Sequence, residues 1–504
     1  MRVILLAATG LILAEPAIAA PDAEPSATVT AAYYAGRIEK ISRDGPRLNA
    51  VIAVNPDWRA LAKALDDERH AGKVRGPLHG RSILIKDNIE SADRMATTAG
   101  SLALADNMTG RDAPLVARLR KGGALILGKT NLSEWANFRS NRSMSGWSGV
   151  GGIVRNPYAL DRTACGSSSG SGVAVAAGLA WAAIGTETDG SIACPAAING
   201  VVGLKPTLGL VSRTRVVPIS HSQDTPGPMT RTVRDAALVL GAIAGTDPAD
   251  AATAEADKRK ADYAAALTGK IAGVRIGVLR ASVGTNPRMT AAFDKALATL
   301  KSLGAVLVDI DKFDVPKEIG PAEGIVLQTE FRADLNAYLA TTPAAVKTRT
   351  LADLIAFNTA NAAREMPYFG QETFLKAEAT KGLDDPEYKK ALVVSQGGAR
   401  ATLDRLFADN KVAMLVAPTR APAWLIDPVN GDQSAGPSSG SLSAVAGYPH
   451  LTVPMAQLMG LPVGLSFMGP AWSEAALLNA GDAFEKARGA LPGPTYRPTI
   501  PLDR

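Results

Sequence analysis

The chain has 504 residues, of which 46% are hydrophobic and 20% are charged. This composition is ordinary for a globular protein, and the length allows a large core in roughly two or three domains. The net charge of +6 is spread thinly, without a long basic run, and aromatic residues make up only 5%. A nucleic-acid groove is therefore not expected.

The first twenty residues differ from the rest of the chain. Arg2 forms a minimal positive region, residues 3–14 are mostly apolar, and Ala17-Ile18-Ala19 fits a small-x-small cleavage site. The apolar run is short and no second such run follows, so we predict a signal peptide over residues 1–19 rather than a membrane span. We expect a periplasmic or secreted protein with no stable membrane association. A buried first helix is the alternative.

Helical and strand patterns then alternate along the chain. Apolar residues recur at helical spacing from Trp58 to Leu65, and an apolar strand is expected at residues 82–85. Residues 115–119 predict a helix and residues 124–127 another strand. Later pairs are a helical face from Phe293 to Leu300 with a strand at 306–308, and a strand at 412–416 with a helix at 473–488.

This alternation predicts an α/β fold with a mostly buried sheet, and no Pro/Ser linker divides the chain. Residues 249–270 are rich in Ala, Asp and Lys, and we expect an exposed helix there that joins the two halves. Residues 315–400 are helical in pattern and carry no catalytic motif. We expect them to form a cap or one side of a substrate cleft.

Cysteine and histidine are scarce. Cys165 and Cys194 are compatible with a disulfide in an oxidising compartment, and equally with two buried thiols. Neither these two cysteines nor the four histidines follow a metal-binding spacing, so no metal is expected.

Two common sequence motifs occur in the chain, but the predicted elements around them differ from those that each motif requires. Residues 123–130 satisfy the phosphate-loop pattern, but residues 124–127 have the pattern of a buried strand, which cannot curl around an anion. Residues 166–170 and 436–440 match the G-x-S-x-G elbow, the first with Ser168 as nucleophile, yet no strand precedes either. Ser438 and Ser441 are more simply helix caps before residues 442–445. A Ser-His-Asp site that uses His221 or His450 is a minor alternative.

The informative residues are two serine loops and one lysine. Residues 166–172 and 186–191 are rich in Gly, Ser and Thr, which allows backbone N–H groups to converge on a developing oxyanion. Lys86 ends the strand at residues 82–85, where desolvation would lower its pKa and favour a neutral, proton-accepting amine. Alternatively, Lys86 reaches the surface and pairs with Asp87.

The order of the motifs is similar to that of the amidase signature family of serine hydrolases, and within it to the bacterial peptide amidases. The similarity runs from about residue 30 to the end. It implies a single large domain over residues 20–504, with a mixed, mostly buried central sheet covered by helices on both faces. The motifs that carry it are Lys86-Asp87-Asn88, Gly128-Lys129-Thr130-Asn131-Leu132-Ser133-Glu134, Arg155-Asn156-Pro157-Tyr158, the two serine loops, Gly203-Leu204-Lys205-Pro206-Thr207, Asp224-Thr225-Pro226-Gly227-Pro228-Met229 and Gly447-Tyr448-Pro449.

The resemblance implies a Ser-Ser-Lys triad and no cofactor. Ser191 would be the nucleophile, Ser167, 24 positions earlier, the bridging serine, and Lys86 the base. The oxyanion would be held by backbone N–H groups of Thr188, Asp189, Gly190 and Ser191.

The chain departs from the pattern Thr-Asp-x-Gly-Gly-Ser-Ile-Arg that many family members have. It has Glu187 for the Asp, Asp189 for the first Gly and Ala193 for the Arg, and the peptide amidases are similar here. The carboxylate of Asp189 would oppose an oxyanion unless it is paired or turned away.

We therefore expect an amidase that acts through an acyl-enzyme, with a peptide amide or a small-molecule amide as substrate. The C-terminal amide of a peptide or an amino-acid amide is the favoured substrate. An aryl acylamidase is the alternative. An amidotransferase subunit, which supplies ammonia for the modification of a charged tRNA, is disfavoured by the signal peptide. A non-catalytic binding protein is disfavoured because all three triad candidates are present.

Overall fold

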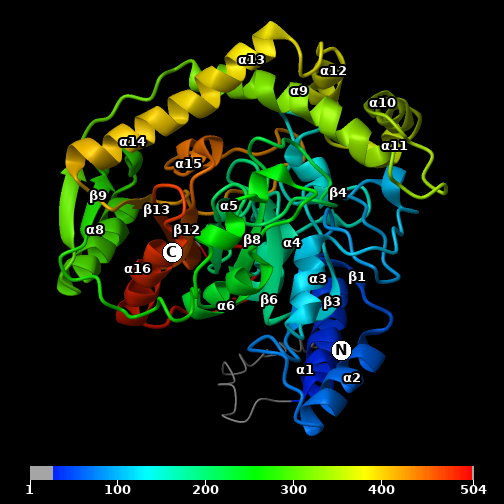
Figure 1. The fold of residues 1–504 in the computed structure, drawn as a ribbon, viewed down its shortest axis with the longest axis horizontal. Coiled ribbons are helices and arrows are strands. Elements are labelled where there is room, and N and C mark those ends of the chain that lie inside the picture. The colour runs from blue at the N-terminus through cyan, green and yellow to red at the C-terminus, as the bar shows by residue number, and fades with distance from the viewer. Residues whose placement is uncertain (1–25, 502–504) are drawn as a thin grey trace, which may run out of the picture.

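The computed structural model describes residues 26–501, and the expected signal peptide lies outside these residues. Eleven strands form one mixed sheet in the order β1-β3-β2-β6-β8-β7-β12-β13-β11-β9-β10, and β4 and β5 form a separate pair (Figure 1). The strands are β1 (Val51–Val54), β2 (Ser82–Lys86), β3 (Leu125–Thr130), β4 (Trp147–Ser148), β5 (Gly152–Ile153), β6 (Ala182–Glu187), β7 (Val202–Lys205), β8 (Thr225–Thr230), β9 (Arg275–Leu279), β10 (Val306–Ile310), β11 (Met414–Pro418), β12 (His450–Leu458) and β13 (Leu461–Met468).

The sheet has parallel strands in two places. Strand β2 lies parallel to β3 on one side and to β6 on the other. Strand β9 lies parallel to β10 and β11 in the same way. The other pairs are antiparallel, so the mixed sheet that the resemblance implied is confirmed.

Helices cover both faces of this sheet, which confirms the expected α/β fold. Their bounds are α1 (Ala27–Arg37), α2 (Trp58–His70), α3 (Pro114–Lys121), α4 (Ser169–Ala176), α5 (Ala193–Ile198), α6 (Val233–Ile243), α7 (Ala256–Arg259), α8 (Pro287–Ser302), α9 (Ile319–Leu339), α10 (Leu351–Ala360), α11 (Ala362–Glu365), α12 (Glu372–Glu378), α13 (Pro386–Leu392), α14 (Gly398–Asn410), α15 (Ser441–Ala446) and α16 (Glu474–Arg488).

The alternation of side chains along each strand divides the core in two. In β2, Ile83 and Ile85 belong to a cluster with apolar residues of α3, α6, α8 and α16. Leu84 points to the opposite face, where it meets residues of α2 and α4. Because both faces are covered, the strand reads as a continuous apolar run, as the sequence indicated.

Most of the elements expected from periodicity are present, but the exposed helix expected at residues 249–270 is wrong. Within that range only a short 3₁₀ turn at Ala251–Thr253 and the four-residue α7 are helical. The carboxylates of Asp247 and Asp250 accept backbone N–H groups of Ala249 and Ala252, at 3.0 and 3.2 Å. Such local bonds favour turns over a helix.

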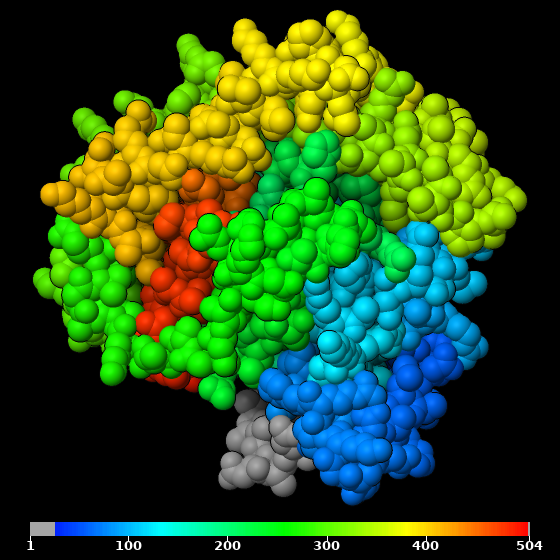
Figure 2. All heavy atoms as spheres, viewed as in Figure 1, coloured from blue at the N-terminus to red at the C-terminus, as the bar shows by residue number. Residues whose placement is uncertain are grey.

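Residues 315–400 are helical, as expected. Helices α9 to α13 and the π-helix Val393–Gly397 run with α14 along one end of the molecule (Figure 1). Figure 2 shows these segments as a band over that end, from yellow-green through yellow to gold. We call α9 to α13 the helical cap. Within residues 26–501, no helix combines the length and apolar character that a membrane crossing requires.

Candidate active site

Lys86 lies at the end of strand β2, directly beside the end of β6. Because β2 and β6 are parallel, their carboxyl ends meet at one edge of the sheet. There the Lys86 Nζ is 2.8 Å from the Ser167 Oγ and 2.8 Å from the Thr186 Oγ1. Its distance to the Thr186 carbonyl oxygen is 3.3 Å. The topology thus brings the predicted base and bridging serine into contact.

The alternative role for Lys86, an exposed partner of Asp87, is wrong. Lys86 is 0% exposed, and the nearby Asp87 carboxylate instead accepts the Thr98 hydroxyl and the Thr98 N–H. Burial lowers the pKa of Lys86 to about 7, although the negative charges of Asp224 and Glu187 oppose the shift. A substantial fraction of this amine is therefore neutral near pH 7.

Three consecutive serines follow Gly166, and only the first contacts the lysine. The Ser168 hydroxyl donates to the Thr186 carbonyl oxygen at 3.0 Å, and the Ser169 hydroxyl donates to the Cys165 carbonyl oxygen at 2.5 Å. Ser168 is fully buried. These contacts leave Ser168 unsuited to be an elbow nucleophile.

Ser191 lies in the second loop, just before α5, and lines a cavity of about 280 Å³. The two loops meet through the backbone, since the Ser168 N–H donates to the Ser191 carbonyl oxygen at 3.1 Å. Among the described residues no hydrogen bond joins the Ser167 and Ser191 hydroxyls. The structure therefore brings Lys86 and Ser167 into contact and places Ser191 in the adjoining loop. The Ser191 hydroxyl is hydrogen-bonded to neither of these two side chains.

The backbone of this second loop is arranged as an anion cradle. Within residues 26–501, the N–H groups of Thr188, Asp189, Gly190 and Ser191 donate no hydrogen bond to the protein. All four residues line the same cavity. Backbone N–H groups are almost always paired in native structures, so a cluster of free ones at a cavity is suited to bind an oxyanion.

Two departures from the family pattern have structural explanations. The Glu187 carboxylate accepts the N–H groups of Ile192 and Ala193, at 2.7 and 2.9 Å, which fixes the start of α5 behind the nucleophile candidate. The Asp189 carboxylate accepts the Ser441 hydroxyl at 2.6 Å. Asp189 thus has a hydrogen-bond partner, and its burial raises the pKa of the carboxyl group, which favours the uncharged form beside an oxyanion.

The expectation that Ser438 and Ser441 cap a helix is wrong in detail. Helix α15 exists, but its N-cap is Gly440, with φ of 106°, and no side chain caps it. Ser441 is the first helical residue and binds Asp189, while the Ser438 hydroxyl accepts the Arg420 guanidinium at 2.8 Å. Both hydroxyls have stronger charged partners than a backbone N–H.

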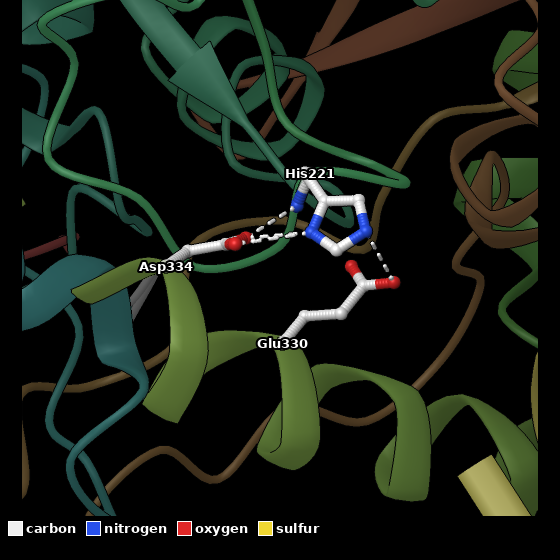
Figure 3. Close-up of side chains that lie close together, drawn as sticks. All are labelled: His221, Glu330 and Asp334. Carbon is white, nitrogen blue, oxygen red and sulfur yellow. Dashed lines mark hydrogen bonds and ion pairs between the residues drawn. The ribbon is translucent and has the colours of Figure 1, made fainter. Parts of the chain in front are cut away.

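The remaining motifs take no part in this site. The phosphate-loop pattern lies on strand β3, as the strand interpretation required. Its Lys129 is buried at the end of that strand and donates to the Ile89 carbonyl oxygen. His450 is buried against the Ser466 hydroxyl at 2.7 Å. His221 lies beside Asp334 and Glu330 of α9 (Figure 3), a cluster that residue spacing did not reveal. Neither histidine contacts a loop serine.

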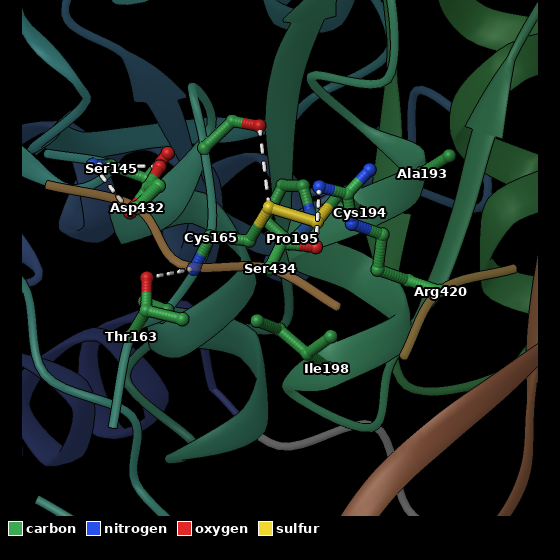
Figure 4. Close-up of a disulfide and its surroundings, with 12 residues drawn as sticks. Ser145, Thr163, Cys165, Ala193, Cys194, Pro195, Ile198, Arg420, Asp432 and Ser434 are labelled. Carbon is green, nitrogen blue, oxygen red and sulfur yellow. Dashed lines mark hydrogen bonds between the residues drawn. A yellow bond between two sulfur atoms is a disulfide. The ribbon is translucent and has the colours of Figure 1, made fainter. Parts of the chain in front are cut away.

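Cys165 and Cys194 form a disulfide, with Cα atoms 6.0 Å apart. Figure 4 shows the bridge between the segment that leads into Gly166 and the helix that follows Ser191. The sequence was compatible with a disulfide and equally with two buried thiols, and the structure has the disulfide. The bridge joins the two serine loops covalently, beside the cavity that they line.

Replacing both cysteines with alanine is expected to lower the free energy of unfolding by about 3 to 4 kcal/mol, because the bridge closes a loop with a sequence separation of 29. Amide hydrolysis should also fall, since the two loops lose their covalent link. Urea unfolding and initial rates check both effects. A reductant should lower the free energy of unfolding of the wild-type protein and leave that of the double-alanine variant unchanged. A variant as stable as the oxidised wild type would contradict a structural role for the bridge.

Sequence reasoning missed several residues that support the site. Thr186 contacts Lys86 and also accepts the Asn88 side-chain amide at 3.0 Å. Asp224 accepts the Thr188 hydroxyl at 2.5 Å. Thr186 and Asp224 both lie inside motifs that resemble those of the family, so a signal was present in the sequence. Their contacts depend on the pairing of distant segments.

A buried lysine against a serine, beside a cavity lined by free N–H groups, has the chemical groups that acyl transfer requires. Comparison with known proteins gives the family of the chain. Residues 30–478 match the family model described as Amidase. The fold is similar to that of native peptide amidase from Stenotrophomonas maltophilia, with 50% identity and a TM-score of 0.89 over 94% of this chain and 96% of that chain.

Two other relatives extend the comparison. A probable amidase of Arabidopsis thaliana is 40% identical over 465 residues, which cover 89% of this chain and 85% of that protein. One subunit of the glutamyl-tRNA(Gln) amidotransferase of Pseudomonas aeruginosa is 33% identical over 495 residues, which cover 94% of this chain and 97% of that protein. The chain belongs to the amidase signature family, and it is a hydrolytic amidase.

Proposed function

We propose that this amidase hydrolyses the C-terminal amide of peptides or amino-acid amides, through an acyl-enzyme on Ser191. The observation that carries the proposal is the 2.8 Å contact between Lys86 and Ser167, next to the unpaired N–H groups of the Ser191 loop. No cofactor or metal is part of the proposed chemistry.

The relay begins with neutral Lys86. A neutral amine has two N–H donors and one lone pair, and Thr186 offers two acceptors, its hydroxyl and carbonyl oxygens. The lone pair is then free to accept the Ser167 proton, while Ser167 accepts the proton of Ser191. Since the two hydroxyls are not bonded to each other in the described structure, we expect that contact to form when substrate fills the cavity.

Attack by the Ser191 oxygen on the amide carbon produces a tetrahedral oxyanion. The N–H groups of residues 188–191 would stabilise it, at about 3 to 4 kcal/mol for each donor that is lost. The C–N bond then breaks, and the relay returns a proton to the leaving nitrogen, which departs as ammonia. Water activated by the same relay attacks the ester carbon, releases the carboxylic acid and restores Ser191.

The choice of substrate rests on similarity. The named peptide amidase is 50% identical and covers nearly the whole chain. The cavity at Ser191 is bordered by the helical cap through Leu327 and by Trp424 and Phe138, which suit an acyl group with apolar parts. The expected signal peptide further supports a periplasmic or secreted enzyme and disfavours an amidotransferase subunit.

Ammonia release from a panel of substrates tests the proposal. Peptide amides and amino-acid amides are expected to give kcat/KM at least about tenfold above anilides and fatty amides, because only the former match the proposed leaving group and acyl part. The Ser191→Ala variant serves as the blank. Faster turnover of anilides would identify an aryl acylamidase instead. Activity confined to glutamine in the presence of a partner would identify an amidotransferase subunit.

A further inference from the structure

Residues 219–224 form a short segment, here called the clasp. It lies between residues 186–191, here called the oxyanion loop, and the helical cap. On the side of the active site, the Asp224 carboxylate accepts the Thr188 hydroxyl at 2.5 Å. The Gln223 side-chain amide donates to the Thr188 carbonyl oxygen at 3.3 Å and to the Glu323 carboxylate of α9 at 3.0 Å. Thr188 is therefore held on both its side chain and its backbone by the clasp.

On the opposite side, the clasp is bound to helix α9 by a fully buried carboxylate. Glu330 accepts the Ser220 hydroxyl at 2.5 Å, the Ser222 hydroxyl at 2.9 Å and the Ser222 N–H at 3.0 Å. It also accepts the Tyr388 hydroxyl of α13 at 2.7 Å. The cap and the oxyanion loop are thus linked through one continuous network of hydrogen bonds.

His221 lies at the exposed edge of this network. The backbone N–H of His221 donates to the Asp334 carboxylate at 3.0 Å, and the ring Nδ1 is 2.9 Å from the same carboxylate. The ring Nε2 is 3.3 Å from the Glu330 carboxylate. Figure 3 shows the ring between the two carboxylates, with one nitrogen toward each. These three residues each offer a ligand atom within 4.8 Å of the others, so a metal ion is the competing occupant. A carboxylate beside each ring nitrogen equally suits a doubly protonated ring, which donates from both nitrogens.

We propose that His221 is a positioning residue for amide hydrolysis: its protonated ring fastens the clasp to α9, and the clasp in turn holds Thr188 in the oxyanion loop. This inference rests on the proposed function, because it assigns Thr188 to transition-state binding. Loss of the contacts between His221 and α9 should reduce stabilisation of the transition state more than binding of the substrate. We therefore expect kcat to fall while KM changes little.

The charges around the ring set the direction of its pH dependence. Hydrogen bonding to Asp334 raises the pKa of His221 above its ordinary value, with Glu330 adding to the effect, while burial and Arg213 oppose it. The charged contacts of the protonated ring with Asp334 and Glu330 are present below this raised pKa and are lost as the pH rises through it. The kcat profile should therefore have a descending alkaline limb that belongs to His221.

The test compares His221→Gln with wild type. We expect kcat to fall about 10- to 100-fold, with KM within about twofold, and the descending limb to disappear. His70→Gln, at the exposed end of α2, is the matched control and should behave as wild type. A double-mutant cycle of His221→Gln with Thr188→Val should be non-additive, because both substitutions act through the same contact. Unchanged kcat with additive effects would overturn the proposal.

Hydrogen–deuterium exchange separates this inference from the proposed function. The N–H groups of residues 219–222 are hydrogen-bonded to Asp224, Asp334 and Glu330, so their exchange should quicken in His221→Gln and not in His70→Gln, whatever the substrate proves to be. A wild-type protein that hydrolyses no peptide amide would contradict the proposed function, while this exchange difference would still support the clasp. Equal exchange in both variants would overturn it. Stoichiometric binding of Zn²⁺ by the wild type, abolished in His221→Gln, would also overturn it in favour of a metal site.

Discussion

Ser191→Ala is expected to lower kcat by about 10⁵- to 10⁶-fold and to leave the fold intact. The hydroxyl is the proposed attacking group, and without it the free N–H groups can bind an oxyanion but no acyl-enzyme forms. The side chain lines the cavity and carries no hydrogen bond to the described part of the chain, so its removal leaves no buried partner unsatisfied. Ammonia release with a peptide amide, alongside circular dichroism, measures both parts of the prediction.

Ser168→Ala is the matched control for this substitution. Ser168 is the nucleophile of the rival elbow interpretation, but its hydroxyl bonds to the Thr186 backbone and does not reach the cavity. Its loss should cost about 1 kcal/mol of stability and retain most of the turnover. Turnover that survives in Ser191→Ala and vanishes in Ser168→Ala would reverse the assignment of the nucleophile.

Local patterns sufficed for the parts of the site that depend on local sequence. An apolar strand that ends in Lys86 is visible because the sheet is covered on both faces, and the Gly/Ser/Thr composition makes the two loops at residues 166–172 and 186–191 visible. Sequence could therefore predict a desolvated lysine, and the resemblance paired it with Ser167. The structure adds the contact itself.

The contacts between distant segments could not be predicted in this way. Ser441 lies 252 positions from Asp189, and Ser220 lies 110 positions from Glu330. Such pairs depend on the order of the strands and on where the cap is placed, and no periodicity encodes either. The failure at residues 249–270 has a different cause, because there composition favoured a helix while aspartate side chains stabilised turns.

The pH dependence of kcat/KM is expected to show an ascending limb near pH 7 that depends on Lys86. Burial lowers the pKa of this lysine to about 7, and the relay requires its neutral form. Below that pKa the rate should fall about tenfold for each pH unit, and above it the Lys86 contribution should level off. Ammonia release between pH 5 and 9 at constant ionic strength measures the limb. A flat profile over this range would contradict Lys86 as the base.

Lys86→Met tests whether the limb belongs to the lysine. Methionine retains an unbranched apolar stem in the buried site but accepts no proton, so kcat/KM should fall by about 10²- to 10⁴-fold and the limb should vanish. Asp224 is the competing origin, since burial raises its pKa to about 6. Asp224 also raises the pKa of Lys86 by its negative charge. In Asp224→Asn the limb should therefore persist and move to lower pH, whereas a limb that disappears there would assign it to the carboxyl group.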